Sequence, residues 1–106
     1  MKRAELIADT RQLIAEGERL QLAPSMAALR VWLQLSDDLL SRAWGKMDRY
    51  HLVWLMVGRS DSARGRRMTA DEEDDYVRDV AAQKTAALQM SLKAVDEQHM
   101  PFLGED

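Results

Sequence analysis

Apolar residues recur at helical spacing along most of the chain. In the first segment Leu6, Leu13 and Leu20 fall seven residues apart, and five of the twelve positions between them are charged. This spacing puts the apolar side chains on one narrow stripe of a helix, which we predict over residues 2–22. Gly17 lies on the stripe, where it costs about 1 kcal/mol of helix propensity against alanine. We therefore expect another helix to cross closely at this position.

A second helix is predicted over residues 24–43. Pro24 ends the first helix because the residue before a proline avoids helical dihedral angles, and proline followed by Ser25 suits a helix start. Gly45 is the expected stop. The apolar positions of this segment are too wide for one stripe, so we expect two of its sides to be covered. They are Met26, Leu29, Trp32, Leu33, Leu35, Ser36, Leu39, Leu40 and Ala43.

Residues 48–57 end in a continuous apolar run, residues 52–57, and the composition of the segment is also typical of strands. We interpret the run as a helix capped by Asp48, because the sequence offers no second strand that could pair with it and a lone strand leaves its backbone unpaired. Its apolar character on all sides predicts a central position, in the single chain or at a subunit interface.

The composition of residues 58–68 predicts a loop, and residues 70–98 a final helix. Thr69 and Glu72 fit a capping box at the start of that helix. In the tail, residues 99–106, we expect Phe102 and Leu103 to fold back onto the helices, since they are otherwise exposed.

Together these segments predict an all-α fold, a small bundle of about four helices. The chain has 106 residues, the size of one domain, so we expect residues 1–106 to form a single helical domain. Five glycines and two prolines argue against a turn-rich β fold, and the absence of cysteine excludes disulfides and thiol chemistry. The side chains expected to be buried are Leu6, Leu13, Leu33, Leu40, Val53, Trp54, Leu88 and Leu92.

Charge is distributed unevenly along the chain, although the net charge is only -3. Residues 1–58 are nearly balanced, residues 59–69 carry four arginines and one aspartate, and residues 70–106 carry three basic and ten acidic side chains. This balance argues against nucleic-acid binding by the whole surface and leaves room for a local basic site. The longest apolar run has six residues, far below the ~20 of a membrane span, and the charged start does not resemble a secretion signal. We therefore expect a cytoplasmic protein.

No pattern of catalytic or metal-binding residues stands out. His51 and His99 lack metal-ligand spacing, and we interpret them as structural. The carboxylates of Glu72, Asp75 and Asp79 share a helix face, which we interpret as a solvated, dipole-favoured first turn, since a cation site needs ligands from a second element. Neither a serine elbow nor a glycine-rich nucleotide loop is present. We expect no enzymatic activity, no cofactor and no metal.

The most distinctive polar feature is a run of four arginines within nine residues: Arg59, Arg64, Arg66 and Arg67. Arginines in a loop can hold phosphates or an acidic protein surface. They can equally pair with the acidic run that follows, in which case they only solubilise the loop.

Three tryptophans lie within 23 residues of each other, and tryptophan is common both in cores and at interface hot spots. A chain this small cannot readily cover the apolar positions of its second and third helices, so we expect a homodimer with Trp32, Leu39 and Trp54 near the interface. The sequence thus predicts a non-catalytic interaction module, of accessory, regulatory or inhibitor type, that acts by binding an unidentified partner protein. The alternative is a nucleic-acid or phosphate-binding module that uses Arg59–Arg67.

Overall fold

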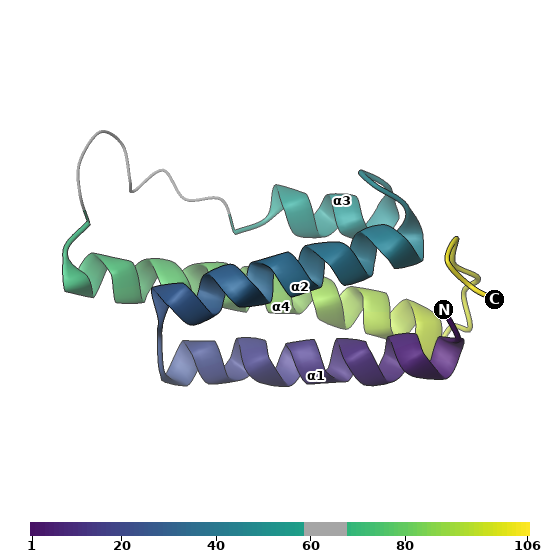
Figure 1. The fold of residues 1–106 in the computed structure, drawn as a ribbon, viewed down its shortest axis with the longest axis horizontal. Coiled ribbons are helices and arrows are strands. Elements are labelled where there is room, and N and C mark those ends of the chain that lie inside the picture. Colours follow the sequence, from purple (N-terminus) through teal and green to yellow (C-terminus); the bar gives the residue numbers. More distant parts are fainter. Residues whose placement is uncertain (59–67) are drawn as a thin grey trace.

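The computed structural model describes residues 1–58 and 68–106, and within them the chain forms four helices and no strand (Figure 1). The all-α prediction is confirmed, and each helix begins and ends within two residues of its predicted bounds. Residues 59–67, most of the predicted loop, lie outside the described part of the chain. The helices are α1 (Arg3–Leu22), α2 (Met26–Trp44), α3 (Arg49–Met56) and α4 (Ala70–Asp96).

The helices pack in a definite arrangement. α1 and α4 share the most extensive contact in the molecule, and α2 packs against both of them. Viewed as in Figure 1, α1 and α2 lie side by side with α4 behind α2. The short α3 packs against α2 and α4 and makes no substantial contact with α1. Within residues 1–58 and 68–106, one face formed by α1 and α2 is therefore left without a covering helix.

Local signals explain where α2 begins and ends. The Ser25 hydroxyl accepts a hydrogen bond from the Ala28 backbone N–H and so caps the helix N-terminus. At the other end the chain leaves the helix at Gly45, whose φ of 100° suits a residue without a Cβ. The predicted stop at Gly45 is confirmed.

The helical interpretation of residues 48–57 is confirmed, but the expected Asp48 cap and a central position in the single chain are wrong. A central position at a subunit interface stays a prediction. Asp48 precedes α3, yet its side chain makes no capping hydrogen bond. The helix is also peripheral rather than central: it buries His51 and Trp54 and leaves Leu52 and Met56 exposed. With only eight residues, α3 packs against α2 and α4, and no other helix of the described chain covers it.

α4 begins with the capping box expected from the sequence. The Thr69 hydroxyl accepts from the Glu72 backbone N–H, and the Thr69 N–H donates to the Glu72 carboxylate, both at 3.2 Å. These two bonds satisfy donors that would otherwise have no partner in the first turn.

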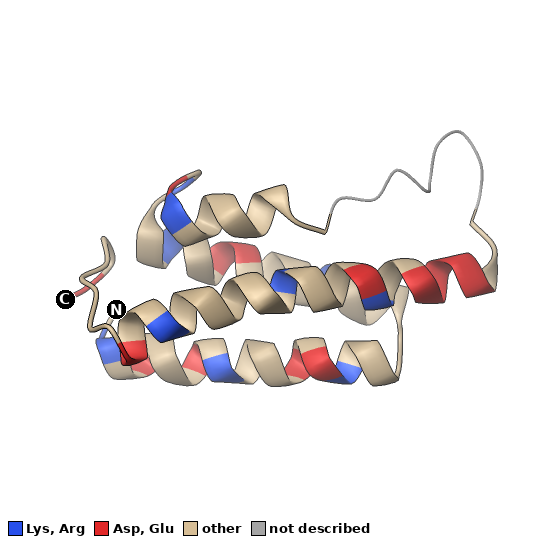
Figure 2. Cartoon of the chain, turned by 180° about the vertical axis from the view of Figure 1, so that it is seen from behind, with Lys and Arg blue, Asp and Glu red and all other residues tan. Residues whose placement is uncertain are grey.

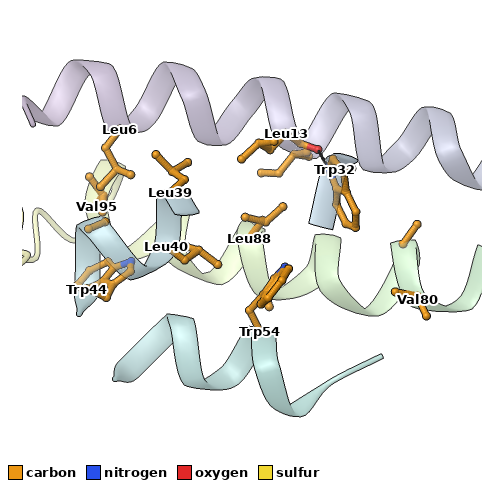
Figure 3. Close-up of a cluster of buried hydrophobic side chains, with 14 of the residues drawn as sticks. Leu6, Leu13, Trp32, Leu39, Leu40, Trp44, Trp54, Val80, Leu88 and Val95 are labelled. Carbon is orange, nitrogen blue, oxygen red and sulfur yellow. Dashed lines mark hydrogen bonds between the residues drawn. The ribbon is translucent and has the colours of Figure 1, made fainter. Parts of the chain in front are cut away.

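The core runs between the helices along most of the bundle (Figure 3). Of the eight side chains predicted to be buried, five are: Leu6, Leu13, Leu40, Trp54 and Leu88. The other three, Leu33, Val53 and Leu92, are only half-buried and pack at the margin of the core. The apolar positions of a helix span a wider face than the neighbouring helices cover, so the side chains at the edges of that face remain partly exposed to solvent.

The two ends of the described chain meet at one end of the bundle (Figure 1). The Arg3 guanidinium donates to the carbonyls of Val95 and Met100 and lies over the Phe102 ring. The tail folds back as expected at Phe102, which is buried, whereas the expectation is wrong for Leu103, which is exposed.

Candidate protein-interaction surface

The crossing of α1 and α2 is set by Gly17 and Trp32. The Trp32 indole N–H donates to the Leu13 carbonyl at 2.8 Å, which links α2 to α1 (Figure 3). A Cβ at Gly17 would lie 2.7 Å from a Trp32 ring carbon and would collide with the Thr85 hydroxyl. The close crossing expected at Gly17 therefore exists. The Trp32 ring occupies part of the space that a side chain at position 17 would need.

On the outer side of this crossing, two adjoining hollows follow the groove between α1 and α2. Their inner walls include edges of the core residues Leu13, Leu20, Trp32 and Leu39. We call the outer part of this groove the α1–α2 face. It consists of Asp9, Gln12, Glu16 and Arg19 from α1 and of Ala28, Val31, Leu35 and Arg42 from α2.

The two helices contribute different chemistry to this face. From α2 come Val31 and Leu35, one helical turn apart and 61% and 48% exposed. From α1 come polar side chains whose charge changes along the helix, from Asp9 at one end to Arg19 at the other. The view from behind in Figure 2 shows both signs of charge along α1 and a gathering of acidic residues at the start of α4.

The sequence-predicted interface residues Trp32, Leu39 and Trp54 lie in the core of the single chain, with exposed fractions of 2–4%. Their side chains therefore offer little surface to a second molecule. An interface near Trp32 and Leu39 would have to be formed by the exposed neighbours Val31 and Leu35. The homodimer itself stays a prediction.

Sequence analysis missed Val31 and Leu35 as site residues, although one signal was available. Both occupy positions of α2 on the side away from Leu40 and Trp44, which are fully buried. The apolar positions of α2 are too many for one helix side, and this indicated a second apolar side. The interface was nevertheless predicted at the tryptophans because of their size.

The arginines at positions 59, 64, 66 and 67 fall outside the described residues, so their predicted contacts remain a prediction. The helix that follows them begins with acidic side chains, of which Asp71, Glu73 and Asp75 are exposed.

A buried histidine, His51, pairs with the partly exposed Asp37 and joins α3 to α2. His51 Nε2 lies 2.5 Å from an Asp37 carboxylate oxygen, and His51 Nδ1 accepts the Met47 backbone N–H at 2.8 Å. Because Nδ1 is the acceptor, the ring proton lies on Nε2 and points to Asp37. Both nitrogens are thus engaged, and the ring stacks on Trp54. This geometry holds the α2–α3 turn and leaves neither nitrogen available as a general base. His51 and Asp37 are fourteen positions apart in the sequence, and no spacing or motif indicated that they would pair.

Among the described residues, no group of three or more histidine, aspartate or glutamate side chains converges on a possible metal position. His99 is exposed beyond the end of α4, far along the chain from His51. Within the same part of the chain, no helix has the length and apolar character needed to cross a bilayer.

Comparison with known proteins adds no functional information. The sequence matches no known family, and no curated protein or solved structure is significantly similar to it. The surface of the molecule itself is therefore the basis for assigning a function.

Proposed function

We propose that the protein is a non-catalytic interaction module, of accessory, regulatory or inhibitor type, that binds a protein through the α1–α2 face. The observation that carries the proposal is the exposed pair Val31 and Leu35 beside two adjoining hollows. Apolar side chains exposed singly are common on proteins, whereas neighbouring ones beside a groove are typical of interaction sites.

The geometry of the face supports this choice over other exposed apolar residues. Helix-in-groove recognition uses apolar anchors at positions i, i+3, i+4 and i+7, and Ala28, Val31 and Leu35 follow that spacing. Leu52 and Met56 on α3 line neither of the hollows near Pro101, and those hollows lie where α3 meets the irregular tail rather than along a groove between two long helices. The cytoplasmic location stays a prediction from the sequence.

Site-specific photocrosslinking tests the proposal. With p-benzoylphenylalanine in place of Ala28, we expect one discrete adduct in extracts of cells that make the protein. The additional substitution Leu35→Glu should abolish the adduct, because a carboxylate would lose its hydration in an apolar contact. The matched control is the same photoreactive residue at Ala86, which is exposed on the far side of α4. Equal adducts from both positions, an adduct that survives Leu35→Glu, or no adduct from position 28 would each contradict the proposal.

The alternative function is phosphate or nucleic-acid binding by the arginines at positions 59–67, and it is supported by their density in the sequence. If it holds, fluorescence anisotropy with labelled single-stranded and duplex oligonucleotides should show binding at 50 mM salt that falls steeply by 200 mM. Replacing Arg64, Arg66 and Arg67 together by alanine should then abolish binding and leave the helical content unchanged. Binding that the triple replacement leaves intact, or no binding at 50 mM salt, would exclude this function.

A further inference from the structure

We propose that the α1–α2 face binds a second copy of this chain, in an antiparallel arrangement with α1 on α1 and α2 on α2. This inference rests on the proposed function and names the partner at the same face. It follows from the order of charges and apolar side chains along the two helices.

The charges of α1 are complementary to themselves when the helix is reversed. Asp9 and Arg19 are ten residues apart, about 15 Å along the helix, and their midpoint lies at residue 14. A two-fold axis crossing the face at that level places Asp9 of each copy opposite Arg19 of the other. Arg19 is 71% exposed and reaches Glu16 of its own chain only loosely, at 3.8 Å, so its remaining donors are available to a second carboxylate.

The same axis matches the side chains of α2. α1 and α2 run in opposite directions from their connection at residues 23–25 (Figure 1), so residues equally far from this connection lie at about the same level, and the midpoint on α1 lies level with about residue 34, beside Leu35. Leu35 then meets Leu35 of the second copy at the axis. By the same count, Val31 of one copy lies opposite Leu39 of the other, whose edge lines the groove. Ala28 of one copy lies opposite Arg42 of the other, and the long aliphatic part of the arginine can cover the small alanine side chain.

The other symmetric arrangement fits poorly. With the two-fold axis along the helices, α1 would lie on α2 of the second copy at the same level. Leu35 would then face Gln12 and Glu16, and a carboxylate would lose its hydration against an apolar side chain. The antiparallel arrangement avoids this cost, because Leu35 meets Leu35, Asp9 meets Arg19, and Glu16 lies opposite the amide of Gln12.

The size of the face sets the expected strength of the contact. Helices of 20 and 19 residues are about 30 Å long, and two helices side by side are about 20 Å wide. Such a face contributes on the order of 600 Å² per copy, so the pair buries roughly 1,200 Å², the lower limit for a specific interface. We therefore expect a concentration-dependent dimer rather than an obligate one.

Sedimentation equilibrium of the full chain, from 10 µM to 1 mM, tests the arrangement through charge exchange. Asp9→Arg alone and Arg19→Asp alone each place like charges opposite each other and should weaken dimerisation about tenfold or more. The double variant restores opposite charges and should recover association to within about threefold of wild type. Glu18→Arg is the matched control, because it makes the same charge change on α1 away from the face and should leave dimerisation unchanged. Circular dichroism checks that each variant keeps its helical content.

A cysteine at the axis gives an independent test. The chain has no natural cysteine, so Leu35→Cys should form a covalent dimer on mild oxidation, whereas Ala86→Cys should not. A monomer at 1 mM, a double variant that fails to recover, or no disulfide at position 35 would overturn the inference. The photocrosslinking adduct distinguishes the proposals: an adduct with a different polypeptide in a monomeric protein retains the proposed function and rejects the second copy as the partner.

Discussion

Replacing Leu88 by alanine is expected to lower the free energy of unfolding by about 2–5 kcal/mol. Leu88 is fully buried near the middle of α4 and lies among core residues of the other helices (Figure 3). The truncation removes apolar contacts and leaves a cavity that the neighbouring helices cannot fully close. Small domains have only about 5–15 kcal/mol of stability, so the change should be obvious in urea unfolding followed by circular dichroism.

Leu92 provides the matched control for Leu88. It lies one helical turn further along α4, carries the same side chain and is only half-buried. Leu92→Ala should therefore cost clearly less than Leu88→Ala, because fewer contacts are lost and solvent reaches the space left behind. Equal losses at the two positions would show that the core does not extend along α4 as described.

Gly17→Ala should also destabilise the protein, although alanine favours a helix by about 1 kcal/mol relative to glycine. The added methyl group would collide with the Thr85 hydroxyl and lie 2.7 Å from the Trp32 ring, so α1 must move away from α2 and α4. Overpacking of this kind costs about 1–3 kcal/mol. Urea unfolding of the variant measures the net effect.

A second substitution identifies the cause of that loss. The Thr85 hydroxyl is buried without a hydrogen-bond partner among the described residues. Thr85→Ala therefore removes the nearer of the two obstructions and breaks no hydrogen bond of that hydroxyl. In the double variant with Gly17→Ala, part of the lost stability should return. Full additivity of the two changes, or a stabilised Gly17→Ala variant, would show that the crossing is not as close as described.

The sequence was a good guide wherever local chemistry decides the structure. Some features determine the structure of only the few residues around them. They are the heptad spacing of leucines in α1, the serine after Pro24, Gly45, and the pair Thr69 and Glu72. Such signals operate whatever the rest of the chain does. Helix bounds could therefore be predicted closely, and so could the close approach at Gly17.

Predictions that depend on what lies across the helix were less successful. An apolar run shows that a segment avoids water, but not which of its sides a neighbour covers, and α3 was wrongly expected to be central for this reason. The candidate site was affected in the same way: the largest apolar side chains of α2 fill the core, and the smaller Val31 and Leu35 remain exposed. The link from His51 to Asp37 depends on how two helices meet, which no spacing encodes.

The extensive packing of α1 against α4 has a consequence for how the protein is made. Contacts between the first and last helices have high contact order, so the largest part of the core closes only when the two ends of the sequence meet. During synthesis, α1 leaves the ribosome before α4 is complete, and only α2 is then available to cover part of its stripe of leucines. Until then the nascent chain exposes apolar surface that attracts chaperones and other unfolded chains. The core around α1 is thus completed only when the last third of the sequence, which contains α4, has been made.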